Sequence, residues 1–575
     1  MKRFYRGLTG LLALALTMAA CGFVPPPSRA GDDKVRKPKL AVIVVFDQLR
    51  GDYLEKWKDL FGEGGFKRLQ TEGAWFTNCH YPYSDTLTAV GHTSLVTGTS
   101  PYKHGIIANE WYDRATGEDT TSVQSDRYEP VPPVRPAQGQ NRILGAAPLR
   151  RREETIGDVL QRASKGKSKI GSLSIKDRAA ILLAALRAHF VYWFSTGAGN
   201  FVTSTYYRDT IHPWVNDFNK QAPQDNGFGK NWTLLRADLD YAKYSGPDDV
   251  AAEGTGFAQG RVFPHPMTGG LTKAGKNFYE ALTTSPQGNE LLLALAKTAV
   301  VAEKMGQGED TDLLSISFSS NDLIGHCWGP DSQEVLDVTL RSDLIVKELL
   351  DFLDAKVGKG QYLLVLSADH GICPVPEVAK AQGKDAGRVS ANGLRIGGED
   401  HLHATFDMDG KKRLWIESMS GSWFYFNKGV IRELGLSSGE VEAALAAWLI
   451  TQPGVQAAYT RSQVEGKPKL DDPIMESVRL SFFPEASGEV KVLLKPYHQF
   501  SVDLIKSPAY ATTHGSPHPY DTHVPLLVIG PGVRPGTHGA RITPQALTTI
   551  LSRGLGIPLP SAAEAPLPKG LFERE

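Results

Sequence analysis

Four runs rich in apolar and β-branched residues constrain the fold of this chain more than any other feature. The first, residues 40–46, reads Leu-Ala-Val-Ile-Val-Val-Phe without any alternation of apolar and polar residues. Runs of the same kind cover residues 312–318, 362–366 and 524–529. A strand that is apolar throughout suits a parallel sheet, because helices cover such a strand on both faces. The runs therefore predict buried strands of one sheet.

Helical patterns separate these runs. Between residues 332 and 357, for example, apolar residues recur at steps of three and four. Strands that alternate with helices in this way predict an α/β fold, a mostly parallel, doubly wound sheet flanked by helices. With 575 residues the chain is long enough for one large core with insertions, and we assign residues 39–575 to this domain.

One region departs from the repeat. Between about residues 414 and 500 the chain is strand-like at 422–426, helix-like at 438–450 and hairpin-like at 489–494. We expect a smaller α+β insertion here, which forms a cap at the mouth of the site.

The N-terminus is typical of a targeting segment. Basic residues at positions 2, 3 and 6 precede an apolar run over residues 8–20. About 13 apolar residues are too few to cross a bilayer, which needs about 20, so we expect residues 1–21 to be a cleaved signal. Cys21 follows Met18-Ala19-Ala20, which leaves two alternatives open: lipidation at Cys21 or ordinary cleavage nearby. Residues 22–38 would be a tether, and the protein would be periplasmic, anchored to the outer membrane, or secreted.

The composition excludes some partners. The chain has 63 Lys and Arg residues against 63 Asp and Glu residues, so no excess positive charge exists to collect nucleic acid. We therefore expect no nucleic-acid partner. Cys79, Cys327 and Cys373 would suffice for one disulfide, or would be three buried thiols. The sequence leaves the oligomeric state open.

Polar residues follow three of the four predicted strands directly. Asp47 comes after the first strand, Asp322 after the second, and Asp369-His370 after the third. In doubly wound sheets, ligands bind at the carboxyl ends of the strands. A single Asp at such a place is more often a helix cap, but three such positions with histidines nearby indicate a site.

The chemistry of these residues indicates metal ions. Asp322-Leu-Ile-Gly-His326 places a carboxylate and an imidazole four residues apart, and Asp369-His370 is a second such pair. Carboxylate oxygen and neutral imidazole both bind zinc at about 2.0–2.2 Å. The predicted ligands are Asp47, Asp322, His326, Asp369, His370 and His514. Six ligands are enough for two zinc ions with open positions for substrate.

The segment of residues 81–98 runs from a loop into a short helix that ends at Gly98. Thr88 stands at the start of this helix, where free N–H groups and the helix dipole favour an anion. Without the metal ligands, Thr88 would be explained equally well as a helix cap.

Together these motifs resemble the alkaline phosphatase superfamily. Within it, Thr88-Ala-Val-Gly-His92, Asn109, the six ligands and their order are similar to the nucleotide pyrophosphatase/phosphodiesterase branch, above all to PafA-type bacterial alkaline phosphatases. The resemblance implies that Asp47, Asp369 and His370 hold the zinc that also contacts Thr88. It implies that Asp322, His326 and His514 hold the second zinc. Thr88 would be the nucleophile and form a phosphothreonine, while Asn109 would donate to a phosphoryl oxygen.

Lys176 and Arg178 follow the strand-like residues 170–175. Two cations two residues apart are usually solvated surface charges, but alternation in an extended chain would direct both to the same side. Their position resembles the paired Lys and Arg with which PafA-type enzymes grip the extra charge of a phosphate monoester. This pair therefore indicates a monoesterase acting on small phosphate esters.

Two other functions remain open. A phosphodiesterase or nucleotide pyrophosphatase would use the same metals and nucleophile, and Lys176 and Arg178 would then point into solvent or the cap would form a nucleotide slot. A zinc- or phosphate-binding protein without turnover would need the metal ligands but no hydroxyl at Thr88.

Overall fold

Strand β1 (Leu40–Phe46) lies near the middle of a large sheet, and all of its residues are buried. Its neighbours β13 (Asp312–Phe318) and β14 (Tyr362–Ser367) run parallel to it, with Leu40 opposite the first residue of each. This computed structural model describes residues 37–134, 143–467, 471–501 and 510–573. The predicted targeting segment and nearly all of the predicted tether lie outside these residues.

Within the described residues the sheet has ten strands. In spatial order they are β22 (Gly536–His538), β2 (Ala74–Phe76), β21 (Leu526–Ile529), β14, β1, β13, β8 (Ile170–Ser174), β9 (Phe190–Ser195), β10 (Asn200–Ser204) and β6 (Pro130–Val131). The five strands from β14 to β9 are parallel, as the sequence predicts.

The sheet as a whole is mixed, because antiparallel strands flank its parallel centre. Strand β21, one of the four predicted strands, runs antiparallel to β14. On the other side β10 runs antiparallel to β9, to which a short turn joins it. A connection this short can join only antiparallel neighbours.

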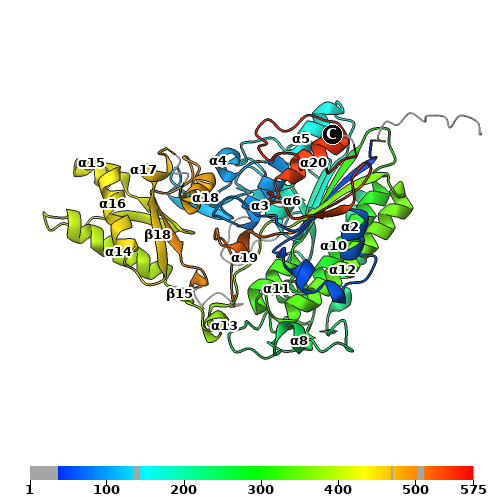
Figure 1. Cartoon of the computed structure of the whole chain (residues 1–575), viewed down its shortest axis with the longest axis horizontal. Coiled ribbons are helices and arrows are strands. Elements are labelled where there is room, and N and C mark those ends of the chain that lie inside the picture. The colour runs from blue at the N-terminus through cyan, green and yellow to red at the C-terminus, as the bar shows by residue number, and fades with distance from the viewer. Residues whose placement is uncertain (1–36, 135–142, 468–470, 502–509, 574–575) are drawn as a thin grey trace, which may run out of the picture. The chain divides into compact units, whose positions relative to one another are not determined.

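Helices cover both faces of the sheet (Figure 1). One group comprises α3 (Thr88–Thr97), α5 (Ile156–Ala163), α6 (Asp177–Leu182) and α20 (Ala546–Leu555). The other comprises α2 (Phe66–Glu72), α10 (Pro286–Ala302), α11 (Ser320–Trp328) and α12 (Gln333–Leu353). Helix α12 accounts for most of the predicted helical stretch. Ser332 caps its start, because the Ser332 side chain accepts a hydrogen bond from the Val335 N–H. This arrangement is the doubly wound α/β fold.

The carboxyl ends of four adjacent strands, β14, β1, β13 and β8, meet at one edge of the sheet. Asp47 follows β1, and Asp369 lies two residues beyond the end of β14. Asp322 lies in the first turn of α11, which follows β13, and Lys176 follows β8. The topology therefore brings these four side chains to a common edge.

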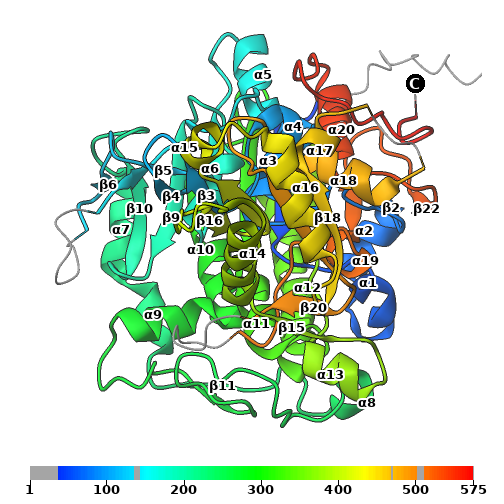
Figure 2. The same cartoon turned by 90° about the vertical axis from the view of Figure 1, so that its left-hand side faces the viewer.

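A second sheet has its own hydrophobic core. Its strands, in spatial order, are β16 (Ile416–Ser420), β17 (Trp423–Phe426), β19 (Val490–Leu494) and β18 (Val455–Thr460), and we call them the cap sheet. Helices α14 (Ala391–Phe406) and α16 (Ser438–Leu449) contribute Leu402 and Leu445 to this core and face the viewer in Figure 2. All four strands fall between residues 414 and 500, whereas α14 precedes that range.

The cap sheet contacts the predicted nucleophile segment through a buried ion pair. Nζ of Lys491 on β19 contacts the carboxylate of Asp85 and lies 2.6 Å from Ser422 Oγ. Lys491 is 1% exposed and Asp85 is 4% exposed, so water screens this pair little. Since Asp85 precedes Thr88 by three residues, the pair joins the cap sheet to the loop that leads into α3.

The three cysteines outside the N-terminal segment, Cys79, Cys327 and Cys373, are buried and form no disulfide with any described residue. In the part of the chain that the structure describes, no helix combines the length and the apolar character needed to cross a membrane.

Candidate active site

Three of the predicted ligands surround one point at the carboxyl edge of β1 and β14. Nε2 of His370 lies 3.5 Å from Asp47 Oδ1 and 3.3 Å from Asp369 Oδ2. All three side chains are fully buried. Donor atoms around a tetrahedral zinc ion with bonds near 2.1 Å lie about 3.4 Å apart. The spacing of these three donors fits one such ion.

The other three predicted ligands form a second group around Asp322. Its Oδ1 lies 3.3 Å from His326 Nε2 and 3.5 Å from His514 Nε2. The rings of His370 and His514 stack with centroids 3.5 Å apart, so the two groups adjoin. The structure therefore brings all six predicted ligands together in two adjoining groups, and His370 also has a ligand atom within 4.8 Å of those of Asp322 and His514.

Backbone carbonyls orient the three histidines. Nδ1 of His326 lies 2.8 Å from the Thr512 carbonyl. Nδ1 of His370 lies 2.9 Å from the Gly371 carbonyl, and Nδ1 of His514 lies 2.8 Å from the Thr86 carbonyl. A carbonyl only accepts, so each Nδ1 must carry the proton and each Nε2 is a free donor atom toward the carboxylates. Metal-binding histidines are typically held in this way.

The buried carboxylates lack enough partners among the described residues. Asp47 Oδ1 and Asp369 Oδ2 are buried and accept no hydrogen bond from any of them. Burial raises the pKa of Asp47 well above its usual value, and the nearby carboxylates of Asp322 and Asp369 raise it further. Such an accumulation of buried negative charge requires cations. The donor set therefore fits a centre for divalent metal ions.

Thr88 is the first residue of α3, and its side chain is buried beside these ligands. Its Oγ1 lies 3.4 Å from His370 Nε2. The helix can approach this closely because Gly91 has no side chain: a Cβ there would lie 2.1 Å from the Asp369 carbonyl oxygen. The hydroxyl thus stands at a helix N-terminus next to the first ligand group.

Asn109 lies beside the same helix end. Its Oδ1 accepts a hydrogen bond of 2.8 Å from the Ala89 N–H, which fixes the orientation of the amide. The Nδ2 group is then left to donate elsewhere. The left-handed φ of +78° at Gly105 turns the chain back toward α3 shortly before Asn109.

Lys176 points into the site. Its Nζ lies 2.8 Å from Asp47 Oδ2 and 2.5 Å from Asp322 Oδ2, and the residue is 8% exposed. Burial opposes the charge of this amine, but Asp322 and Asp47 outweigh burial and raise its pKa. The ammonium group therefore stays charged between the two ligand sets.

The predicted extended geometry of Lys176 and Arg178 is wrong in one respect. Strand β8 ends at Ser174, and α6 begins at Asp177, so Arg178 is a helical residue. Lys176 caps this helix with an extended backbone, and the charge of Arg178 acts to lower the pKa of Lys176. Arg178 Nε is buried and donates to no described residue. A turn into a helix, rather than strand alternation, brings the two cations together.

Comparisons with known proteins agree with this geometry. Residues 41–392 match the family model of type I phosphodiesterases / nucleotide pyrophosphatases. The chain belongs to this family. It is 32% identical over 531 residues to alkaline phosphatase PhoV of Synechococcus elongatus, covering 92% of each chain. It is also 32% identical over 534 residues to alkaline phosphatase PafA of Elizabethkingia meningoseptica, covering 92% of this chain and 93% of PafA. The crystal structure of PafA superposes with a TM-score of 0.82 at 31% identity, over 94% of this chain and all of that chain.

Two further residues support the ligands of this phosphodiesterase-family site. Gln48 has a left-handed φ of 70°. Apart from its place after Asp47, nothing in the sequence marks this residue. Its backbone N–H donates to Asp369 Oδ1 (3.0 Å) and its Nε2 to Asp322 Oδ1 (2.7 Å). A Cβ at Gly325 would lie 1.8 Å from Gln48 Oε1, which explains the glycine between Asp322 and His326.

His92 is the other supporting residue. Its Nδ1 lies 2.8 Å from the Thr88 carbonyl and 3.1 Å from Asp369 Oδ2, and its Nε2 lies 2.7 Å from Ser317 Oγ. Together with Asp47 and Asp369, it also forms a group whose ligand atoms lie within 4.8 Å of one another. Because the Thr88 carbonyl only accepts, Nδ1 carries a proton, and this N–H dipole lies close to the Asp369 carboxylate and stabilises its charge.

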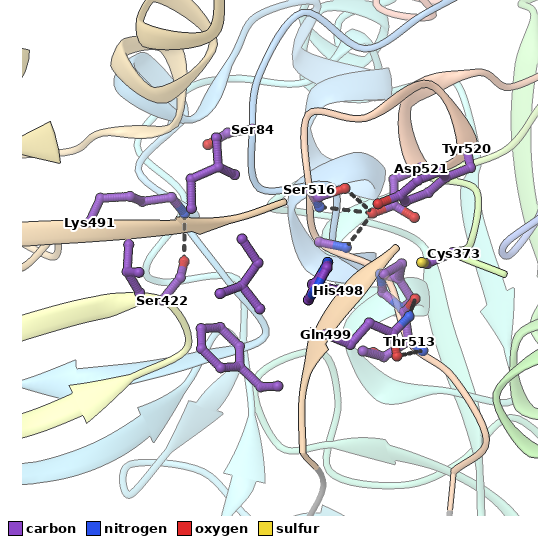
Figure 3. A pocket seen from close by; sticks show the side chains of 16 residues that line it. Ser84, Cys373, Ser422, Lys491, His498, Gln499, Thr513, Ser516, Tyr520 and Asp521 are labelled. Atoms are coloured by element: carbon purple, nitrogen blue, oxygen red, sulfur yellow. Dashed lines mark hydrogen bonds between the residues drawn. The ribbon is translucent and has the colours of Figure 1, made fainter. Parts of the chain in front are cut away.

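Asp521 holds the loop that carries His514 (Figure 3). Its Oδ2 accepts hydrogen bonds from the Gly515 N–H (3.1 Å), the Ser516 N–H (2.9 Å) and Ser516 Oγ (2.6 Å). Its backbone carbonyl accepts from the Gly371 N–H (2.7 Å). The sequence analysis missed this residue, which ties together the two segments that carry His370 and His514.

A cavity of about 70 Å³ adjoins the same loop. Lys491 lines it from β19 and Ser422 from the turn between β16 and β17. Ser516, Asp521 and Cys373 line it from the loops around the ligands (Figure 3). Binding sites for drug-sized ligands typically measure about 300–1,000 Å³. This cavity is therefore too small for a nucleoside as it stands.

Proposed function

We propose that this chain is an exported, metal-dependent phosphate monoester hydrolase, an alkaline phosphatase that acts through a covalent phosphothreonine at Thr88. The observation that carries the proposal is the position of Thr88 Oγ1, at a helix N-terminus and 3.4 Å from His370 Nε2 within the ligand cluster. PhoV and PafA, to which the chain is similar over most of its length, bear the name alkaline phosphatase.

Each residue has a distinct task in this reaction. Thr88 Oγ1 gives up its proton and attacks phosphorus, the bond from phosphorus to the ester oxygen breaks, and the alcohol leaves with a proton. Water then attacks the phosphothreonine, the bond from phosphorus to Thr88 Oγ1 breaks, and phosphate leaves while Thr88 Oγ1 regains a proton. Asn109 Nδ2 donates to a nonbridging oxygen, where one well-aimed donor typically contributes about 10²–10³ in rate.

Six residues would hold the metal: Asp47, Asp322, His326, Asp369, His370 and His514. We propose two zinc ions, because imidazole and carboxylate donors at spacings of 3.3–3.5 Å suit tetrahedral zinc. When bound, such ions lower the pKa of a hydroxyl nucleophile and neutralise charge on the leaving oxygen.

The burial of Lys176 favours monoesters over diesters. A monoester carries one more negative charge than a diester, and the Lys176 ammonium group is buried beside both ligand groups. The phosphodiesterase alternative requires Lys176 and Arg178 in solvent or a nucleotide slot beside the cap. Lys176 is 8% exposed, so the first of these requirements is not met.

Export remains part of the proposal. It rests on the basic residues and apolar run at positions 2–20 and on Cys21, with either lipidation or ordinary cleavage as the processing step.

The ratio of monoester to diester turnover tests this function. For the wild type we expect kcat/KM for an aryl phosphate to exceed that for the corresponding diester. In Arg178→Ala, and more so in Lys176→Ala/Arg178→Ala, we expect monoester turnover to fall by about 10²-fold while diester turnover changes little. Because Lys176 contacts two ligands, zinc content must be measured for each variant. A wild-type preference for the diester would defeat the monoesterase assignment.

Thr88→Ala separates the enzyme from a binding protein without turnover. We expect this variant to keep its zinc and to lose the phosphoenzyme that can be trapped at low pH. A variant that still forms a phosphoenzyme would remove Thr88 from the nucleophile role.

A further inference from the structure

Two histidines and a glutamate form a cluster at the end of the sheet opposite to the active site. His189 directly precedes β9, and its backbone N–H donates to the Ile170 carbonyl (2.7 Å) at the amino end of β8. Lys176, in contrast, follows the carboxyl end of β8. The cluster and the active site therefore lie at opposite ends of the same strand.

Helix α10 gives a measure of their separation. Near its start, Asn289 Nδ2 donates to Asn321 Oδ1 (2.8 Å), next to the ligand Asp322. At the other end of α10, Glu303 directly follows the last helical residue, Ala302. A helix of 17 residues is about 25 Å long. The cluster thus belongs to a different part of the molecule from the catalytic centre.

The three side chains have the spacing of metal ligands. His189 Nε2 lies 3.0 Å from Glu303 Oε2, and His212 Nε2 lies 3.8 Å from Glu303 Oε1. One ligand atom from each residue falls within 4.8 Å of the other two. These distances bracket the separation of about 3.4 Å expected between donors on one tetrahedral zinc ion.

Neighbouring side chains hold two of the three residues in place. The Tyr192 hydroxyl lies 2.8 Å from His212 Nδ1, and Trp214 Nε1 donates to Glu303 Oε1 (2.7 Å). Partners that hold a ligand from behind are typical of metal sites. His189 is 41% exposed, which leaves the site open to solvent for the entry of an ion and a bound water.

We propose that His189, His212 and Glu303 bind a zinc ion that is separate from the active-site metals. Two imidazoles and one carboxylate complete three corners of a tetrahedron, and water takes the fourth. The ion joins the start of β9, the start of α7 (Pro213–Gln221) and the end of α10. Its effect is to stabilise this edge of the domain, because an ion that binds only the folded state raises Tm.

Arg208 opposes the ion in the present geometry. Its guanidinium group contacts both ring nitrogens of His212. Arg208 is half-buried on the loop between β10 and α7, and it has to move aside when the ion binds. The proposal therefore predicts that Arg208→Ala binds the additional zinc with a lower Kd than the wild type.

The test is the zinc content of the full chain with its active-site metals in place. After equilibration in buffered free zinc and gel filtration, the wild type should hold one equivalent more than His189→Ala. The turnover of a phosphate monoester should be the same in both. Added zinc should raise the Tm of the wild type but not that of His189→Ala.

Two further variants guard against an effect of misfolding. Glu303→Gln keeps an oxygen to accept from Trp214 but loses the charge, and it should also lose the additional equivalent. His401→Ala on α14, a matched histidine replacement far along the chain in the cap, should retain it. Equal zinc content in the wild type and His189→Ala would overturn the proposal. A Kd that does not fall in Arg208→Ala would contradict the placement of the ion.

Discussion

Two clusters of buried carboxylates among the described residues have different surroundings. At the active site Asp369 faces the imidazoles of His370 and His92. A second cluster lies near the start of α12, where Glu253 and Glu334 each have a buried oxygen that accepts no hydrogen bond from any described residue. The only imidazole in contact with these two glutamates, among the described residues, is that of His265, whose Nε2 lies 3.0 Å from Glu334.

The difference between the two clusters is one of charge. Burial opposes ionisation of Asp369, but His370 and His92 outweigh burial and lower its pKa below the usual value. At the second cluster burial and the charge of Glu334 raise the pKa of Glu253 to about 9, and burial lowers the pKa of His265 to about 4. Burial and the neighbouring carboxyl group thus keep Glu253 protonated at neutral pH. Burial of acids alone therefore does not make a metal centre.

The largest effect that follows from this comparison is expected for Asp369→Asn. The amide cannot supply the anionic oxygen that His370 and His92 face, so zinc should be lost from the first ligand group. We expect turnover of a phosphate monoester to fall by at least about 10³-fold, the scale of losing a principal electrostatic stabiliser. Metal analysis and steady-state kinetics on the same preparation measure both effects.

Glu253→Gln is the matched control for this substitution. It also converts a buried carboxyl group into an amide, but at the cluster that we take to be protonated. Zinc content and turnover at pH 7 should both stay at wild-type values. A loss of zinc in Glu253→Gln would mean that the second cluster is a metal site as well.

Asp521→Asn should have an intermediate effect. Asp521 positions the loop of His514 through Gly515 and Ser516. Replacing a partner of this kind typically lowers metal affinity by about 10–100-fold. We expect activity at low free zinc to fall by that factor and excess zinc to restore it.

The surface variant Asp385→Asn is the control for Asp521→Asn, because Asp385 is 74% exposed and should change neither zinc affinity nor activity. If excess zinc fails to rescue Asp521→Asn, the residue acts on something other than the retention of metal.

The sequence predicts the centre of the sheet and the six ligands because their signals are local. A continuous apolar run identifies each buried strand, and Asp369-His370 follows one directly. The residues that support the ligands carry no such signal, since their partners are distant. Gln48 bonds to Asp322 across 274 positions of the chain, and only the fold brings them together.

Lys176 and Arg178 illustrate a different limit. Their spacing of two suggests an extended strand, but the structure places the helix start between them. Asp177 is the first residue of this helix, and aspartate is favoured in the first turn of helices. A single aspartate does not locate a helix boundary, because assigned boundaries commonly differ by one or two residues. The resemblance to a known family marks the pair as functional, and the fold determines its geometry.

The smallest effect concerns stability, and Glu253→Gln measures it. An unfolded glutamate has a pKa of about 4.3, whereas Glu253 in the folded protein has one of about 9. Between these values the folded state binds the extra proton. Stability from protonated Glu253 is therefore complete below about pH 4 and is lost as the pH rises through 9.

Glutamine cannot lose this proton, so the Tm of Glu253→Gln should fall less than that of the wild type between pH 6 and pH 10. Because Glu253 is not fully buried, we expect a gain on the order of 1 kcal/mol at pH 10, a rise of roughly 1 °C in the Tm of a chain this long. Melting curves of both proteins in matched buffers give this difference directly. If the Tm of both proteins changes equally with pH over the whole range, Glu253 is already ionised near neutral pH. A cation would then have to stabilise the second acidic cluster, and the contrast with the active site would fail.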